Sequence, residues 1–347
     1  MRRLLNTLYV TTDGAWLKKD GANLVMMCDG EERARLPVHM LESLICFGRI
    51  LVSPPLMAYC SEQGITISYF TPNGRFQARV EGPVAGNVLL RRTQYRATDD
   101  PAQCAAIVRH LLIGKIHNQR AVVRRRLRDR GDKLAAEDQR ELQITADQLE
   151  RIGQRLMGTR DAEALRGLEG EAAQRYFKTF QALINDDGQS TFEFTGRNRR
   201  PPRDPVNALL SFVYTLLTHD CRSAIEACGL DPQVGFLHRD RPGRPSLALD
   251  LAEEFRPFIA DRLVLTLINR RQIKANDFRE AENGAVLLTD DGRRTVLTAY
   301  QERKREELVH PFLEEKAPLG LVPALQAQLL SRYLRGDLDA YPPFIRS

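Results

Sequence analysis

The stretch EGPVAGN, residues 81–87, divides the sequence into two parts of different character. Before it, short runs rich in β-branched and aromatic residues are separated by Asp-Gly or Asn-Gly pairs, the strongest short-range signal for a turn between two strands. After it, long segments carry apolar residues at the three- and four-residue spacing of a helix. The sequence therefore predicts an α+β protein, with a β-sandwich-like N-terminal domain followed by a mainly α-helical domain.

In the N-terminal part, turns are expected at residues 13–14, 20–21, 29–30 and 73–74, and the strands they separate are LLNTLYV, NLVMM, ARLPV, SLICFG, ITISYF and RFQARV. PPLMAYCSEQG, residues 54–64, opens with proline and closes with glycine, which predicts one short helix. We expect residues 1–84 to form this domain and residues 85–96 to form a linker.

Residues 97–347 are expected to form the helical domain, with long helices within residues 104–127, 161–184 and 205–230. One segment interrupts this pattern. In NGAVLLTDDGRRTVLTA, residues 283–299, the pair Asp291-Gly292 lies between two β-branched runs. This arrangement predicts a β-hairpin embedded in the helical domain, with its turn at that pair.

The composition limits the class of protein. The 347 residues are 43% hydrophobic and 28% charged, as in an ordinary globular protein. No apolar run approaches the roughly 18 to 20 residues that a membrane helix needs, and MRRLLNTLYVTTDG lacks the apolar core of a signal peptide. The six cysteines form no CxxC pair, so neither a zinc knuckle nor a disulfide framework is indicated. We expect a cytoplasmic protein with no membrane partner.

Arginine is concentrated in two segments of this weakly basic chain, which has a net charge of +6. They are NQRAVVRRRLRDRGDK, residues 118–133, and TGRNRRPPRDP, residues 195–205. Each can contact several DNA phosphates if its arginines share one face. The first segment is followed by acidic EDQREL, so it also fits the solvated face of a helix.

GFLHRDRPGRPSLALDLAEEFRP, residues 235–257, combines a histidine with an acidic helix. The apolar stripe of that helix is formed by Leu247, Leu251, Phe255 and Phe258. Asp250, Glu253 and Glu254 border the stripe, so two carboxylates can point at one spot. Such oxygen ligands suit a divalent cation, and the imidazole of His238 suits manganese or another transition ion. The same spacing also fits carboxylates paired with arginines and a histidine in a capping or core position.

LRGLEGEAAQRYF, residues 165–177, places Glu169 between Gly167 and Gly170 in an otherwise strong helix pattern. Because glycine in a helix costs about 1 kcal/mol relative to alanine, we expect another group to approach closely beside this carboxylate. Tight helix packing at both glycines, with Glu169 facing solvent, is the alternative.

In PPRDPVNALLSFVYTLL, Asp204 followed by Pro205 predicts the start of a helix. Asn207 and Tyr214 lie seven residues apart and so share a face of that helix. The pattern fits a Tyr214 that packs in the core with a bonded hydroxyl, and it fits one that touches substrate.

Taken in this order, these motifs resemble the CRISPR-associated integrase and endonuclease (Cas1) family, which inserts new spacers into CRISPR arrays. The resemblance covers essentially the whole chain and includes LLNTLYVTTDGAWL, TPNGRF, GNVLLRRTQYR, LRGLEGEAAQRYF, PPRDPVNALLSFVYTLL, GLDPQVGFLH and GRPSLALDLAEEFRP. The first segment and GNVLLRRTQYR look most like subtype I-C.

The resemblance implies a divalent metal, magnesium or manganese, held by Glu169, His238 and Asp250. It implies a further catalytic carboxylate at Glu253, with Glu254 as a lower-ranked alternative. Asn207 and Tyr214 match supporting residues of the family. The proposed DNA contacts are Arg197, Arg199, Arg200, Arg203, Arg239, Arg241 and Arg244.

The function implied is that of a metal-dependent DNA endonuclease and integrase in antiviral defence. It joins spacer DNA to the array by direct transesterification, because no covalent nucleophile with a paired base is evident. The implied partners are double-stranded and branched DNA, a second copy of the chain, the Cas2 protein and, for this subtype, the Cas4 nuclease. The alternative is a catalytically silent dimeric scaffold that binds DNA through its arginines.

Overall fold

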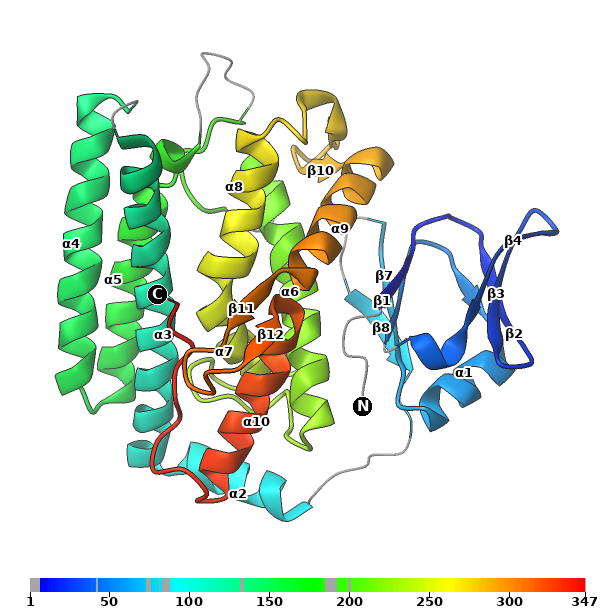
Figure 1. Cartoon of the computed structure of the whole chain (residues 1–347), viewed down its shortest axis with the longest axis horizontal. Coiled ribbons are helices and arrows are strands. Elements are labelled where there is room, and N and C mark those ends of the chain that lie inside the picture. Colours follow the sequence, from blue (N-terminus) through cyan, green and yellow to red (C-terminus); the bar gives the residue numbers. More distant parts are fainter. Residues whose placement is uncertain are drawn as a thin grey trace. The chain divides into compact units, whose positions relative to one another are not determined.

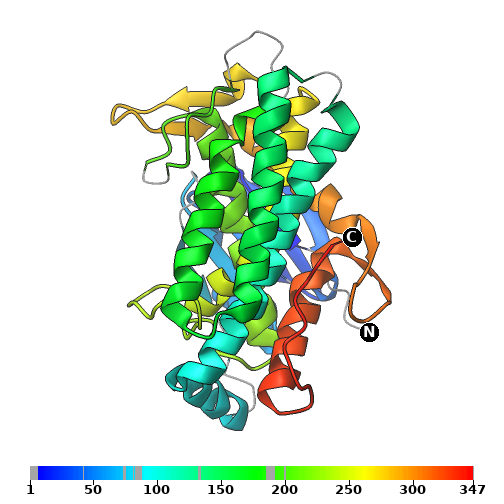
Figure 2. The same ribbon diagram turned by 90° about the vertical axis from the view of Figure 1, so that its left-hand side faces the viewer.

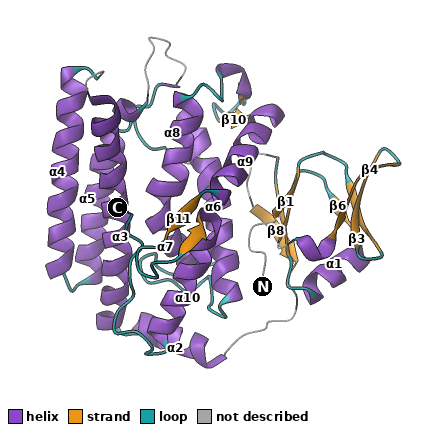
Figure 3. Ribbon diagram, viewed as in Figure 1, coloured by secondary structure: helices purple, strands orange, loops and turns teal. Residues whose placement is uncertain are grey.

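The computed structural model describes residues 7–41, 43–72, 76–80, 82, 88–131, 134–184, 192–198 and 201–346. The chain divides into two compact units, one of residues 1–85 and 290–305 and the other of residues 86–289 and 306–347. Strands dominate the N-terminal part and helices the remainder (Figure 3). This confirms the α+β fold class, whereas the domain boundaries at residues 84 and 97 stay a prediction. No helix among the described residues is long and apolar enough to cross a membrane.

The first unit contains two four-stranded sheets, ordered β1-β5-β7-β8 and β4-β3-β2-β6. Their elements are β1 (Thr7–Val10), β2 (Trp16–Asp20), β3 (Asn23–Cys28), β4 (Glu31–Pro37), β5 (Ser43–Phe47), β6 (Leu51–Val52), α1 (Pro54–Glu62), β7 (Thr66–Phe70) and β8 (Phe76–Val80). Strands β1, β5 and β7 run parallel, while β2, β3 and β4 alternate in direction. Leu17 and Leu24 of one sheet, Leu44 and Ile67 of the other and Leu56 of α1 share one buried core, as expected for a sandwich.

Two of the predicted turns close hairpins as expected. Gly21 and Ala22, directly after Asp20, join β2 to β3, and Asp29-Gly30 joins β3 to β4. Asp29 and Gly30 have φ values of 52° and 82°, the positive angles of a two-residue hairpin turn. Asp13-Gly14 closes no hairpin, because β1 and β2 belong to different sheets. Asn73-Gly74 lies outside the described residues.

The second unit is mainly helical. Its elements are α2 (Val88–Asp99), α3 (Pro101–Arg130), α4 (Ala136–Gly158), α5 (Ala162–Lys178), α6 (Pro205–Ala227), α7 (Ser246–Phe255), α8 (Arg262–Asn269), β9 (Phe278–Glu280), β10 (Val286–Leu288), β11 (Glu307–Val309), β12 (Lys316–Pro318) and α10 (Val322–Leu334). The three long predicted helices correspond to α3, α5 and α6, and helix α2 occupies most of the stretch expected to be a linker. Helices α3, α4 and α5 lie side by side (Figures 1 and 2).

The embedded hairpin exists, but the prediction of its position was wrong. It pairs β9 with β10, and its connection contains Asn283-Gly284, with Gly284 at a φ of 72°. The pair Asp291-Gly292 instead lies in the first turn of helix α9 (Asp290–Arg305). Acidic residues are favoured there by the helix dipole, and the following apolar residues, Val296, Leu297 and Tyr300, are buried at helical spacing.

Candidate active site

The loop of residues 235–238 is fastened to helix α7 by Asp250, which is fully buried. Its Oδ2 accepts hydrogen bonds from the backbone amides of Phe236 at 2.6 Å and Leu237 at 2.9 Å, and its Oδ1 accepts one from the amide of His238 at 2.9 Å. A Cβ atom at Gly235 would lie 2.7 Å from Asp250 Oδ2. Only glycine therefore allows this close wrapping of the loop around the carboxylate.

Arg166 on α5 binds the backbone carbonyls of the same loop. Its guanidinium donates to the backbone carbonyl of Leu237 at 2.7 Å and to that of Phe236 at 3.0 Å. A helix that carries a predicted site residue, Glu169, is thus bonded to the loop that carries another, His238. Together, Arg166 and Asp250 fix the path of the loop.

The ring of His238 is oriented by the same carboxylate. Its Nδ1 lies 2.6 Å from Asp250 Oδ1, and its Nε2 lies 4.0 Å from Oε1 of Glu253. We place a proton on Nδ1, because an ionised carboxylate can only accept. In neutral histidine this leaves the Nε2 lone pair directed toward Glu253, which is the arrangement of a metal-ligating imidazole.

Lys115 on α3 joins two of the predicted acidic residues. Its ammonium forms ion pairs with Glu169 on α5 and, at 2.7 Å, with Oε2 of Glu253 on α7. Burial lowers the pKa of Lys115, but the attraction of Glu253 and Glu169 outweighs burial, and the net pKa is raised. The lysine is therefore positively charged at neutral pH, and it links the carboxylates of two helices.

Glu253 is almost completely buried, and its carboxylate also pairs with Arg256, one helical turn further along the chain. Burial by itself raises the pKa of Glu253, yet Arg256 and Lys115 more than compensate, so the net pKa is lowered. Glu253 thus carries a negative charge at neutral pH despite its burial.

The side chain of the neighbouring Glu254 lies near Tyr341 and Gln326 rather than near His238 and Lys115. It accepts hydrogen bonds from Tyr341 at 2.8 Å and Gln326 at 3.2 Å. Burial raises its pKa to about 8, against smaller opposing effects of these hydrogen bonds. Of the two glutamates, only Glu253 shares the surroundings of His238 and Lys115.

Tyr214 lies on α6, and its ring is close to Arg256, the residue that follows α7. Its hydroxyl donates to Oδ1 of Asp261 at 2.6 Å, and Tyr176 donates to Oδ2 at 3.0 Å. The ring of Tyr214 also lies near two guanidinium groups, those of Arg197 at 5.3 Å and Arg256 at 4.9 Å. Its hydroxyl is therefore bonded within the protein, and its ring connects these arginines.

Asn207 is fully buried and organises the segment before α6. Its side chain accepts from Arg197 at 2.6 Å and donates to the carbonyl of Gly196 at 2.8 Å and to Asp204 at 2.6 Å. Asp204 caps helix α6, as the sequence predicts: its Oδ1 accepts a hydrogen bond from the backbone amide of Asn207 at 2.7 Å.

The arginines predicted to contact DNA have different surroundings. Arg197 is bonded internally to Asn207, and Arg239 pairs with Glu163 at 2.6 Å. Arg203 and Arg241 have exposed side chains. Arg244 is half-buried, with its Nε 3.4 Å from the Ser246 hydroxyl. Arg199 and Arg200 lie outside the described residues.

The Lys115 ammonium makes the close approach expected beside Glu169, whereas the alternative, tight helix packing at Gly167 and Gly170, is not found. Among the described residues, no atom outside the helix would lie within 4 Å of a Cβ added at either position. The two exposed glycines therefore lie on an open face of α5, while Glu169 itself pairs with Lys115 of α3.

Sequence reasoning missed four residues of this cluster: Lys115, Arg166, Arg256 and Asp261. Arg256 lies three residues after Glu253, so helical spacing alone can reveal it. Lys115 precedes Glu169 by 54 residues, and no local spacing relates them. Only the packing of α3 against α5 and α7 brings them together.

The described residues contain no group of three or more His, Cys, Asp or Glu side chains arranged to hold a metal ion. Instead, Glu169 and Glu253 converge on the Lys115 ammonium. The donor types nevertheless suit a divalent cation, since carboxylate oxygens and one imidazole nitrogen gather around a positive charge.

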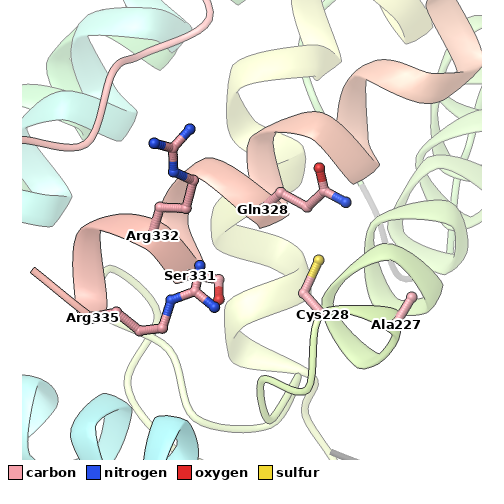
Figure 4. Close-up of a pocket in the computed structure, with 6 residues that line it drawn as sticks. All are labelled: Ala227, Cys228, Gln328, Ser331, Arg332 and Arg335. Carbon is pink, nitrogen blue, oxygen red and sulfur yellow. The ribbon is translucent and has the colours of Figure 1, made fainter. Parts of the chain in front are cut away.

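A separate pocket of about 350 Å³ lies between the end of α6 and helix α10. Figure 4 shows its lining, which consists of Ala227, Cys228, Gln328, Ser331, Arg332 and Arg335. None of the predicted site residues lines it, so it is distinct from the cluster around His238.

An oriented imidazole, carboxylates from two helices and buried cations define a centre suited to phosphoryl transfer, because such groups stabilise charge on a phosphate under attack. The family model of the CRISPR associated protein Cas1 matches residues 8–302 of this chain. The chain belongs to this family.

A CRISPR-associated endonuclease Cas1 from Rhodospirillum rubrum is 60% identical over 346 residues, which cover 99% of each chain. A fusion of exonuclease Cas4 with endonuclease Cas1 from Geobacter sulfurreducens is 37% identical, and the match covers 97% of this chain and 60% of the fusion. The structure of a Cas1 protein from Thermotoga maritima has a TM-score of 0.80 at 24% identity, covering 95% of this chain and 97% of that one; this likeness shows the fold. Membership of the family confirms the predicted function, an endonuclease and integrase of CRISPR adaptation.

Proposed function

We propose that this CRISPR-adaptation enzyme carries out metal-dependent DNA cleavage and strand transfer at the cluster of Glu169, His238 and Glu253. The observation that supports this most directly is the orientation of His238: Asp250 engages its Nδ1, and its Nε2 faces Glu253. This leaves one ligating nitrogen beside an ionised carboxylate. The buried positions of Asp250 and Glu253 keep this arrangement rigid.

The residues proposed to hold magnesium or manganese are Glu169, His238 and Glu253. Asp250, which the sequence also suggests as a ligand, is better suited to hold His238, because both of its oxygens already accept backbone hydrogen bonds. When bound, the ion would neutralise charge on the phosphoryl group and assist loss of the proton from the attacking hydroxyl.

In strand transfer, the 3′-hydroxyl of the incoming DNA attacks a phosphodiester of the array. A new phosphorus–oxygen bond forms, the bond to the 3′-oxygen of the target strand breaks, and that oxygen takes up a proton. In cleavage, water takes the place of the 3′-hydroxyl. Arg256, which pairs with Glu253, would supply positive charge near the reacting phosphate and so stabilise negative charge in the transition state.

DNA is proposed to reach the centre across the open face of α5 at Gly167 and Gly170. Arg203, Arg241 and Arg244 remain candidates for phosphate contacts, as do Arg199 and Arg200. Arg197 and Arg239 have internal partners, so their contribution to DNA binding would require exchange of those partners for phosphate.

The finer assignments are also proposals. The substrates are double-stranded and branched DNA, the chain acts as a homodimer through its N-terminal domain, and Cas2 bridges two dimers. The fusion of Cas4 with Cas1 in the relative from Geobacter sulfurreducens supports Cas4 as a further partner. The resemblance of LLNTLYVTTDGAWL and GNVLLRRTQYR supports subtype I-C.

Cleavage of a branched DNA with added Mg²⁺, with Mn²⁺ and with EDTA tests this function. We expect cleavage only with a divalent ion, and its loss in Glu169→Gln, His238→Ala and Glu253→Gln while DNA binding persists. Full cleavage by these variants would refute the assignment of the centre. Binding without cleavage in the unmodified protein would favour a silent DNA-binding scaffold.

A further inference from the structure

Lys115 stands out because lysine is almost never buried unless it is paired, and its side chain is 7% exposed. Its ammonium forms ion pairs with both Glu169 and Glu253. These are two of the three side chains proposed to hold the divalent ion. Lys115 therefore pairs with the same carboxylates that are proposed to bind the metal.

The backbone of α3 is built to bring Lys115 to this place. At the preceding residue, Gly114, an added Cβ would lie 3.0 Å from Oε1 of Glu254, so α3 approaches α7 too closely for a larger side chain. One turn later, Asn118 donates to the backbone carbonyls of Glu254 and Phe344, both at 2.9 Å. The segment that carries Lys115 is thus fixed on both sides.

The charges of the cluster indicate what the lysine does. Glu169, Asp250 and Glu253 contribute three negative charges, and Lys115 and Arg256 contribute two positive ones when His238 is neutral. The cluster is therefore close to balance without a metal. Without Lys115 it would lack two positive charges, which is the charge of one divalent ion.

From this geometry we propose that Lys115 is a built-in counter-cation that competes with the divalent ion for Glu169 and Glu253. In the metal-free protein its ammonium keeps the two carboxylates together and compensates their charge. Binding of the ion requires Lys115 to give up at least part of both ion pairs. The inference rests on the proposed function, since it takes the two glutamates to be metal ligands.

The test compares Lys115→Met with the intact chain by titrating Mn²⁺ and following free Mn²⁺ by electron paramagnetic resonance. We expect the variant to bind Mn²⁺ at least tenfold more tightly, because a positive charge close to the ion has been removed. Its Tm in EDTA should fall, and saturating Mn²⁺ should raise its Tm more than that of the intact chain. Equal or weaker Mn²⁺ binding would overturn the proposal.

Lys178→Met is the matched control, because Lys178 pairs with Glu141 at 3.3 Å and its side chain is 65% exposed. We expect this variant to bind Mn²⁺ as the intact chain does. His238→Ala separates the two hypotheses: if Mn²⁺ binding by the intact chain does not depend on His238, the proposed metal centre fails. If Mn²⁺ binding does depend on His238, but Lys115→Met and Lys178→Met bind Mn²⁺ equally tightly, only the proposed role of Lys115 fails.

A second measurement needs no substitution and so is independent of whether Lys115→Met folds. The intact chain is treated with an amine-acylating reagent in EDTA and in saturating Mn²⁺, and modification of Lys115 is followed by peptide mass spectrometry. Competition predicts that Mn²⁺ increases the acylation rate of Lys115 several-fold relative to that of Lys178. An unchanged ratio would contradict it.

Discussion

Asp250 holds His238 at two points, accepting the backbone amide at 2.9 Å and contacting ring Nδ1 at 2.6 Å with the same oxygen, Oδ1. Its second oxygen accepts the two preceding amides. One buried carboxylate therefore sets both the path of the loop and the direction of the imidazole. Asp250 of α7 therefore positions His238, whereas Glu253, three residues later on the same helix, is a proposed metal ligand.

Asp250→Asn should reduce DNA cleavage about 10- to 100-fold, the usual effect of removing the partner of a metal-ligating histidine. An amide group cannot accept at all four of these contacts, so Tm should also fall. Asp240→Asn, at an exposed position of the same loop, is the control and should leave both unchanged. The assignment of Asp250 is wrong if the two variants cleave equally well.

The adjacent glutamates should respond differently to the same substitution. Glu253→Gln removes an ionised carboxylate next to His238 and should lower single-turnover cleavage at least 100-fold. Glu254→Gln keeps acceptor and donor atoms near Tyr341 and Gln326, so its cleavage rate should stay within a few-fold. The reverse order of effects would show that Glu254 is the reactive neighbour.

Gly167→Ala and Gly170→Ala should each raise the free energy of unfolding by up to about 1 kcal/mol, because both glycines are exposed helical positions with open space for a methyl group. Gly114→Ala should lower it, since its Cβ would meet Glu254. If DNA crosses the open face of α5, the two stabilised variants should cleave more slowly. Undiminished cleavage would place the DNA elsewhere.

The pH dependence of stability should reflect Asp261, whose pKa burial raises to about 6 against the opposing hydrogen bonds of Tyr214 and Tyr176. A raised carboxyl pKa means that the folded state retains a proton that the unfolded state loses above about pH 4. The favourable contribution of Asp261 to the free energy of unfolding is therefore complete below pH 4. It is lost as pH rises through 6.

Asp261→Asn removes that titration. The free energy of unfolding of the intact chain, measured relative to this variant, should fall by on the order of 2 to 3 kcal/mol between pH 4 and pH 7. Urea denaturation of both proteins at intervals of one pH unit measures the difference. A difference that stays constant or grows with pH would contradict the prediction.

Arg203 and Arg241 allow a test of DNA contact, because their side chains are exposed. If each binds a phosphate, its replacement by alanine should weaken binding to all DNA sequences alike and reduce the slope of log affinity against log salt by about 0.9. Arg33→Ala, on strand β4, serves as a comparison. An unchanged slope would show that the two arginines are solvent-exposed residues that do not contact DNA.

Most of the fold was predictable because its signals are local. The Asp-Gly turns, the proline and glycine at the ends of α1 and the Asp204 cap act within a few residues. The hairpin was misplaced because Asp291-Gly292 resembles a turn pair, while the stronger Asn283-Gly284 pair lay eight residues earlier. The burial of Val296, Leu297 and Tyr300, which favours a helix there, is not a local property.

The sequence by itself determined the family, the α+β class and the short set of acidic residues and histidine from which a site can be made, because motif order and apolar spacing are written along the chain. Only the tertiary structure decided which atoms meet. The burial of α7 turns Asp250 toward the loop, Glu253 toward His238 and Glu254 toward Tyr341, and the packing of α3 inserts Lys115 between carboxylates from two other helices. Charge balance in a buried cluster depends on such distances, which residue spacing does not encode.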